Sequence, residues 1–193
     1  MLENEIKEII MNWSNYLKIP NFLRISGKDV ENVLLNLKLR KGSKVLDVGA
    51  AYGRISIFMR DMGYEVVPLD RDANMVKFLK EKGFDAVLMD ARHMRFKNNS
   101  FDLIITDGLL EHFKNTKDIE KTIREEIRLS RKLVVNFVPS NIFINSILEK
   151  VQRVPKEYRQ HDWIALHKKA MNKKKYKIRK IKLKRLEAYI IRK

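Results

Sequence analysis

The sequence predicts an α/β fold in which a doubly wound, mostly parallel sheet is covered by helices on both faces. Short apolar runs alternate with amphipathic segments from about residue 44 to residue 138, which is the pattern of strands and crossover helices. The first apolar run ends in a glycine-punctuated turn, and 193 residues suit one domain with a sizeable core. The sequence contains neither an internal repeat nor a linker rich in glycine, serine or proline that would separate a second domain.

Two helices are expected before the sheet, near Glu3–Leu17 and Gly27–Leu39, with a turn around Pro20-Asn21 between them. Apolar residues stand at helical spacing in the first of these helices, at Ile6, Ile9, Ile10, Trp13 and Leu17. Such a stripe usually packs on a neighbouring element, so we favour packing over a lid that closes on a substrate.

The strands of the sheet are expected at about 44–49, 64–69, 85–89, 101–106 and 132–138, and the helices between them near 54–62, 73–82 and 117–130. Thr116 and Asp118 are candidate caps of the last of these helices. Pro139-Ser140-Asn141 ends the fifth strand, and Ile142–Val151 is expected to form a further helix.

The turn after the first strand is the most specific feature of the chain. Asp47 lies in the first apolar run, and small residues follow at Gly49, Ala51 and Gly53. Glycine lets backbone N–H groups and a helix N-terminus come close to a nucleotide-like ligand. The pattern differs from the dinucleotide fingerprint, because Ala51 and Arg54 stand where its second and third glycines would be.

Carboxylates also end the next strands, at Asp70, Asp90 and Asp107. Asp70 follows Asp47 by 23 residues. At the carboxyl end of a neighbouring parallel strand, a carboxylate can accept two hydrogen bonds from a ribose diol. Because ligands of open α/β sheets lie beyond the carboxyl ends of the strands, we expect these side chains to converge on one site.

These four motifs, in this order, resemble the class I S-adenosylmethionine-dependent methyltransferases, and within them the small-molecule branch that is methyltransferase type 11-like. The resemblance implies a Rossmann-like methyltransferase fold, methyltransferase activity and S-adenosyl-L-methionine as the cofactor. The turn would then hold the methionine part of the cofactor, Asp70 the ribose and Asp90 the adenine amino group, while Ala51 replaces the usual middle glycine. The residues expected to bind the cofactor are Asp47, Gly49, Ala51, Gly53, Asp70, Arg71, Asp90, Ala91 and Asp107.

On this interpretation the chain forms a single methyltransferase domain over residues 1–193. Residues 1–40 form N-terminal helices, residues 41–138 form the cofactor-binding core, and residues 139–193 form an acceptor-side segment and a basic terminal hairpin. The sheet of the family ends in an antiparallel hairpin, which places two strands near 176–186 and 187–192.

Positive charge is concentrated at the C-terminal end of the sequence. Residues 168–193 hold 13 Lys or Arg and one acid, Glu187, and so carry +12 of the formal net charge of +17. Charges on an edge hairpin prevent edge-to-edge pairing of sheets. A concentrated positive patch also attracts phosphate backbones, so RNA or another polyanion is a candidate partner of residues 168–193. The charge pattern leaves both interpretations open.

The amino-acid composition excludes several classes of site and mechanism. The absence of cysteine excludes disulfides, thiolate metal sites and a cysteine nucleophile, including the one used in pyrimidine C5 methylation. The four histidines show no ligand spacing, so no metal site is expected. No apolar stretch reaches the roughly 18 residues of a membrane span, and the signal-peptide pattern is missing. We therefore expect a cytoplasmic protein with no membrane partner, and the oligomeric state is left open.

The candidate catalytic residues are His112, Tyr158 and His161. His112 follows the fourth strand and titrates near neutral pH, so it is a candidate base; a structural hydrogen-bonding role is the alternative. Tyr158 and His161 lie with Arg159 in residues 155–163, which are rich in aromatic and polar side chains. The resemblance places this segment where family members build their acceptor pockets, although solvation alone would also favour such residues in a loop.

The acceptor is not named by these motifs. The fourth strand ends in Thr106-Asp107-Gly108-Leu109, without the Asn/Asp-Pro-Pro-aromatic signature that resembles amino-group methylation of adenine or glutamine. We therefore expect a methyltransferase that acts on a small molecule, with RNA or a ribosomal component as the alternative acceptor. A third hypothesis is a non-catalytic cofactor-binding adaptor, and the three carboxylates Asp47, Asp70 and Asp90 at one rim argue against it.

Overall fold

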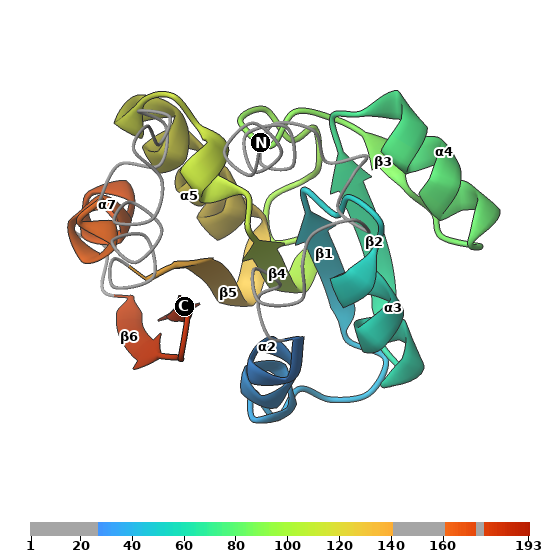
Figure 1. The fold of residues 1–193 in the computed structure, drawn as a ribbon, viewed down its shortest axis with the longest axis horizontal. Helices are drawn as coiled ribbons and strands as arrows, with labels where there is room; N and C mark the ends of the chain where they lie inside the picture. The colour runs from blue at the N-terminus through green and yellow to red at the C-terminus, as the bar shows by residue number, and fades with distance from the viewer. Residues whose placement is uncertain (1–26, 141–160, 173–175) are drawn as a thin grey trace, which may run out of the picture.

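The computed structural model describes residues 27–140, 161–172 and 176–193. A sheet of seven strands, in the order β3-β2-β1-β4-β5-β7-β6, crosses the molecule (Figure 1). The first five strands run parallel: β1 (Lys44–Val48), β2 (Glu65–Asp70), β3 (Val87–Leu88), β4 (Phe101–Asp107) and β5 (Ser130–Pro139). At one edge, β7 (Leu186–Arg192) and β6 (Lys177–Lys182) add an antiparallel hairpin. The predicted fold class is confirmed.

Helices cover both faces of this sheet (Figure 1). They are α2 (Gly27–Leu35), α3 (Arg54–Asp61), α4 (Ala73–Glu81), α5 (Thr116–Leu129), α7 (Trp163–Ala170) and the short 3-10 helix η2 (Leu110–His112). Apolar residues of α2 and α3 pack on one face, and those of α5 and α7 pack on the other. No helix among the described residues is long and apolar enough to cross a membrane.

The predicted strands and crossover helices are found within a few residues of their expected bounds. The expected caps of α5 were wrong: Asn115, not Thr116 or Asp118, caps this helix, and its side chain accepts a hydrogen bond from the Asp118 N–H at 2.9 Å. Asparagine suits this position because its short side chain reaches the free backbone N–H groups of the first turn. The expected helices near 3–17 and 142–151 lie outside the described residues.

Helix α7 was not expected, because the sequence analysis assigned no helix to its residues. It begins after Asp162, whose side chain accepts a hydrogen bond from the Ala165 N–H at 3.0 Å. Trp163, which is 1% exposed, anchors the helix in the core beside α5. A cap and a buried anchor therefore begin a helix at the end of residues 155–163, the segment that the sequence analysis treated as a loop.

The hairpin has a defined orientation relative to the parallel strands. Pro139, at the end of β5, pairs with Leu186 at the start of β7, and Lys182 at the end of β6 pairs with Glu187. The turn between β6 and β7 therefore lies at the carboxyl edge of the sheet. The Ser140 N–H donates a hydrogen bond to the Arg185 carbonyl at 2.9 Å, which fixes the turn against the end of β5.

Candidate active site at the carboxyl edge of the sheet

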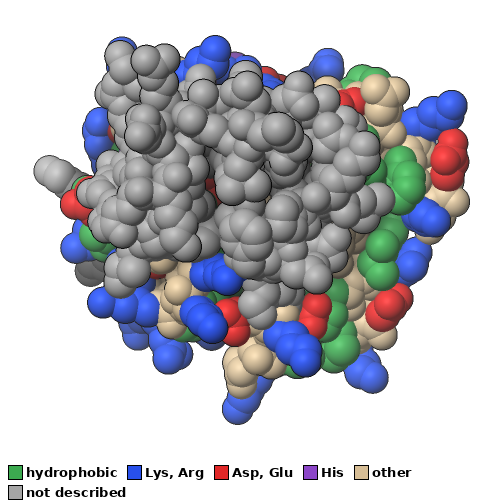
Figure 2. Space-filling view, viewed as in Figure 1, with side chains coloured by type: hydrophobic (Ala, Val, Ile, Leu, Met, Phe, Trp, Pro, Cys, Tyr) green, Lys and Arg blue, Asp and Glu red, His purple; other side chains and the backbone are tan. Residues whose placement is uncertain are grey.

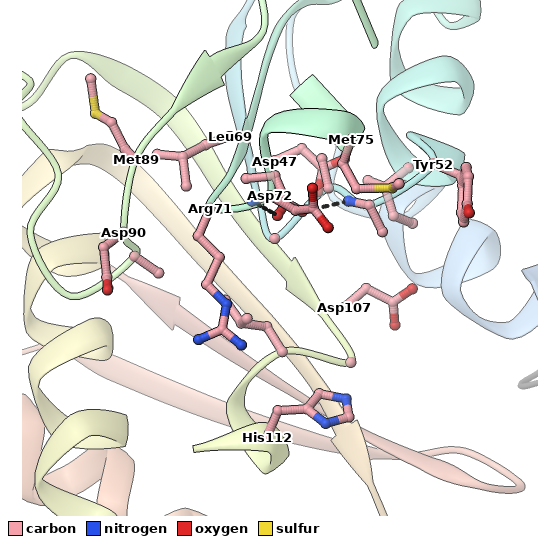
Figure 3. A pocket seen from close by; sticks show the side chains of 18 of the residues that line it. Asp47, Tyr52, Leu69, Arg71, Asp72, Met75, Met89, Asp90, Asp107 and His112 are labelled. Atoms are coloured by element: carbon pink, nitrogen blue, oxygen red, sulfur yellow. Dashed lines mark hydrogen bonds between the residues drawn. The ribbon is translucent and has the colours of Figure 1, made fainter. Parts of the chain in front are cut away.

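A cavity of about 390 Å³ opens where β1, β2 and β4 end (Figure 3). This is the point between β1 and β4 at which the strand order reverses, and open α/β sheets bind their ligands there. The volume is within the range of small-molecule sites. The cavity is lined by Asp47, Gly49, Ala50, Ala51, Tyr52, Arg54, Ile55, Leu69, Asp70, Arg71, Asp72, Met75, Met89, Asp90, Ala91, Asp107, Gly108, Leu109, His112 and Phe113.

The turn between β1 and α3 forms one wall of the cavity. Gly49 and Gly53 both have φ of 74°, and Ala51 has φ of 46°, so three residues adopt the left-handed conformation. That conformation costs a residue with a Cβ about 1–2 kcal/mol, a cost that Ala51 carries and that a glycine would avoid. Gly53 does not line the cavity. It is the N-cap residue before α3, and a Cβ there would lie 2.5 Å from Leu79 Cδ2.

Asp47 lies near the end of β1, just before this turn, and it contacts the first turn of α3. It is 2% exposed, and Ser56 Oγ of α3 donates a hydrogen bond to its Oδ2 at 2.6 Å. Burial raises the pKa of Asp47 to about 7, against the opposing effect of the Ser56 hydrogen bond. Its carboxyl group therefore ties the end of β1 to the first turn of α3.

Asp70, the last residue of β2, joins two loops through both oxygens of its carboxylate. Oδ2 accepts a hydrogen bond from the Ala51 N–H at 2.9 Å, and Oδ1 accepts one from the Asp72 N–H at 2.9 Å. A carboxylate offers about four acceptor positions, so further hydroxyl donors can still bind here. The Asp70 side chain is therefore fixed by two backbone groups, and it lies in the cavity wall.

Asp90 is held by Arg92, which the sequence analysis did not identify. Arg92 Nη2 donates to Asp90 Oδ2 at 2.6 Å, and Arg92 Nε donates to Asp90 Oδ1 at 2.9 Å. These hydrogen bonds lower the pKa of Asp90 to about 2. Arg92 also donates to Asp118 of α5 at 3.0 Å, so the arginine connects the end of β3 to that helix.

Asp107, at the end of β4, forms an ion pair with Arg54 of α3. Burial raises the pKa of Asp107 above its ordinary value, although Arg54 opposes this effect. Both residues line the cavity. The signal for Arg54 in the sequence was its position directly after the last glycine of the turn, but its partner lies 53 residues away and could not be identified from spacing.

His112 lines the cavity at the end of η2, and the Arg71 side chain extends across the cavity toward it (Figure 3). Burial and the positive charge of Arg71 lower the pKa of His112 to about 4, against a hydrogen bond with the Gly108 backbone. The imidazole is therefore uncharged at neutral pH. Beside it, burial raises the pKa of Glu111 to about 8, and the charge of Asp107 adds to this shift.

The structure brings together most of the residues that the sequence analysis selected. Eight of the nine predicted cofactor-binding residues line the cavity, Gly53 being the exception, and so does His112. His161 is not among the lining residues; its ring makes an edge contact with Trp163 at 4.9 Å between centroids. Tyr158 lies outside the described residues. The sequence analysis missed the apolar part of the wall, formed by Tyr52, Met75, Met89, Leu109 and Phe113.

These apolar residues have no motif of their own, and only their nearness in sequence to the motif residues could have indicated them. Aromatic and thioether side chains offer flat or adaptable surfaces for a planar ring. Among the described residues, no group of three or more His, Cys, Asp or Glu side chains is arranged to hold a metal ion.

The middle of the chain is similar to known methyltransferases. Residues 46–133 match the family model of a methyltransferase domain. The chain is 33% identical over 94 residues to the tRNA (carboxymethyluridine(34)-5-O)-methyltransferase alkbh8 of Xenopus tropicalis, covering 49% of this chain and 15% of that protein. It is 36% identical over 100 residues to the demethylmenaquinone methyltransferase of Renibacterium salmoninarum, covering 49% of this chain and 40% of that protein. The chain thus spans less than half the length of these two relatives.

Solved structures share the fold along most of the chain. The magnesium protoporphyrin IX methyltransferase of Synechocystis PCC 6803 with bound SAH superposes with a TM-score of 0.70 at 16% identity, covering 86% of this chain and 81% of that chain. The PH0226 protein of Pyrococcus horikoshii OT3 superposes with a TM-score of 0.72 at 15% identity, covering 92% of this chain and 98% of that chain. At such identities the likeness concerns the fold.

Proposed function

We propose that this chain transfers the methyl group of S-adenosylmethionine to an acceptor. It has the fold of the class I S-adenosylmethionine-dependent methyltransferases, and its residues 46–133 match the family model of a methyltransferase domain. The observation that carries the proposal is the convergence of Asp47, Asp70, Asp90 and Asp107 on one cavity at the strand-order reversal.

The residues present fit this cofactor. Asp70 is fixed by two backbone N–H groups and keeps acceptor positions for the ribose hydroxyls. Asp90, held ionised by Arg92, can accept from the adenine amino group. Gly49 and Ala51 would lie along the methionine part, where the tight turn brings the backbone close to a ligand. When bound, S-adenosylmethionine supplies an activated methyl group, and the protein has to orient the acceptor in line with it.

We assign His112 the task of accepting a proton or a hydrogen bond from the acceptor. Its uncharged ring lines the cavity, and Arg71 on the opposite side disfavours the imidazolium form. Because the pKa of His112 is about 4, the ring is a weak base, and it can assist transfer only when it lies close to the attacking atom.

Two classes of methyl acceptor are candidates, a small molecule and RNA. The sequence favours a small molecule, and the demethylmenaquinone methyltransferase is a relative with such an acceptor in its name. The relative whose name specifies tRNA supports RNA instead. The position of the basic hairpin relative to the cavity helps to decide between a small-molecule acceptor and RNA.

The cofactor assignment is tested by titration calorimetry of S-adenosylmethionine and its demethylated product with the full chain. We expect both to bind, and Asp70→Ala to weaken binding by about 1.5–3 kcal/mol, the range for hydrogen bonds to a charged group. Asp85→Ala is the matched control, because Asp85 is an exposed carboxylate outside the cavity wall. Absence of binding by the unsubstituted chain, or tighter binding of a nicotinamide dinucleotide, contradicts the proposal.

A further inference from the structure

The outer strand β6 and the turn that follows it form a basic edge of the molecule. We use this name for Lys177, Arg179, Lys180, Lys182, Lys184 and Arg185. The four cations of β6 and Lys184 are exposed, whereas Ile178 and Ile181 between them pack on the two apolar clusters. Figure 2 shows Lys and Arg side chains gathered over this part of the surface, at the lower left.

Acidic side chains neutralise little of this charge. Residues 176–193 contain eight Lys or Arg and a single acid, Glu187. Glu187 already accepts a hydrogen bond from Tyr189 OH at 2.6 Å and forms an ion pair with Lys180 Nζ at 2.7 Å. Within the described part of the chain, no ion pair is found for Lys177, Arg179, Lys182 or Lys184.

The carboxyl end of the basic edge lies on the same side of the sheet as the cavity. Lys182 pairs with Glu187 at the start of β7, and the Leu183 N–H closes the turn on the Leu186 carbonyl at 2.9 Å. β6 is separated from β4, which ends at the cavity, by β5 and β7. At a strand spacing of about 4.8 Å, three steps place the basic edge on the order of 15 Å from β4.

Protection of an edge strand explains part of this pattern. One or two charges on β6 would prevent pairing with another sheet. That role does not require Lys184 and Arg185, which lie beyond the strand in the turn.

We propose that the carboxyl end of the basic edge binds the sugar–phosphate backbone of an RNA acceptor whose target nucleotide enters the cavity. The inference rests on the proposed methyltransferase function and specifies its substrate class. Lysine and arginine side chains bind phosphate by charge and release the counterions that surround the nucleic acid. Lys182 and Lys184 lie at the carboxyl end of the basic edge, and no ion pair is found for them within the described part of the chain, so they are the ones that position the RNA.

The test compares two double variants of the full chain, each of which lacks two cations. Lys182→Gln with Lys184→Gln removes two cations at the cavity edge, and Lys177→Gln with Arg192→Gln removes two exposed cations at the opposite edge. Both variants lose the same charge, and neither pair contributes to the cavity wall. Binding of a fluorescently labelled RNA stem-loop is measured by anisotropy over a range of salt concentrations, and S-adenosylmethionine binding is measured by calorimetry.

For the cavity-edge pair we expect the slope of log affinity against log salt concentration to become shallower by about 1.5, because each lost phosphate contact contributes about 0.7–0.9. The opposite-edge pair should leave the slope nearly unchanged, and S-adenosylmethionine should bind both variants like the unsubstituted chain. Equal effects of the two pairs, an unchanged slope for the cavity-edge pair, or feeble RNA binding at physiological salt would overturn the proposal. If the unsubstituted chain does not bind S-adenosylmethionine, the proposed methyltransferase function is contradicted instead.

Discussion

Two histidines of this chain have the same perturbed pKa in different surroundings. Burial lowers the pKa of both His112 and His167 to about 4. His112 ends a short helix in the cavity wall, opposite the charged side chain of Arg71. His167 is fully buried in α7, where Nδ1 lies 2.6 Å from the Trp163 carbonyl oxygen and Nε2 lies 3.0 Å from Asn136 Oδ1.

The surroundings, and not the pKa, separate the two roles. The His167 ring stacks on Tyr189 at 4.5 Å between centroids and belongs to a buried polar network. In that network Asn136 Nδ2 donates to Glu126 Oε2 at 2.8 Å and to Thr106 Oγ1 at 2.5 Å. A perturbed pKa marks burial in general, and it indicates function only where the group also faces a cavity.

His112→Gln should produce the largest functional effect. If His112 assists proton removal, we expect turnover to fall about 100-fold, while S-adenosylmethionine affinity changes only a few-fold. Turnover is measured as transfer of labelled methyl groups to total RNA and to the small-molecule fraction of a cell extract. The free energy of unfolding should fall by no more than about 1.5 kcal/mol, the contribution of the hydrogen bond with the Gly108 backbone. Unchanged turnover would make His112 a structural part of the wall.

His167→Leu should have the opposite profile. The substitution removes the stack on Tyr189 and the one hydrogen bond that the uncharged ring can donate, to the Trp163 carbonyl or to Asn136 Oδ1. Each buried unsatisfied polar group costs about 1–3 kcal/mol, so we expect the free energy of unfolding to fall by about 2–4 kcal/mol. Urea denaturation measures this, with His112→Gln as the control. A loss of less than about 1 kcal/mol would show that the network contributes little to stability.

Glu126→Gln should change how stability depends on pH. Burial raises the pKa of Glu126 from 4.5 to about 8, so between these values the folded chain holds a proton that the unfolded chain lacks. The free energy of unfolding therefore falls as pH rises through this window, by up to about 1.4 kcal/mol per pH unit.

Glutamine cannot ionise, so in the variant the free energy of unfolding should no longer contain the fall with pH that Glu126 causes. Urea denaturation at about pH 6 and about pH 7.5 measures it against the original chain. Glu111 and Asp47, whose pKa values are also raised, are present in both proteins and cancel in the comparison. Equal slopes for the two proteins would mean that Glu126 is already ionised in the fold.

The amino-acid sequence by itself determined the parallel sheet, the turn after β1 and the carboxylates at the strand ends. These features depend on local chemistry: apolar runs form strands, glycines permit the left-handed turn, and the last residue of a parallel strand must lie at the carboxyl edge. The position of Asp70 and Asp90 at the carboxyl edge therefore follows from their place at the ends of parallel strands. His161 could not be placed in this way, because the chemistry of its segment did not show which way the chain turns.

Only the tertiary structure decided which charged groups meet. Arg54 pairs with Asp107 from 53 positions away, and Arg71 reaches across the cavity toward His112. The structure also placed the turn of the basic edge at the carboxyl side of the sheet, since that depends on how β7 pairs with β5. The physical reason is that such contacts join segments distant in sequence, whose approach is set by strand order and register and not by the residues of either segment.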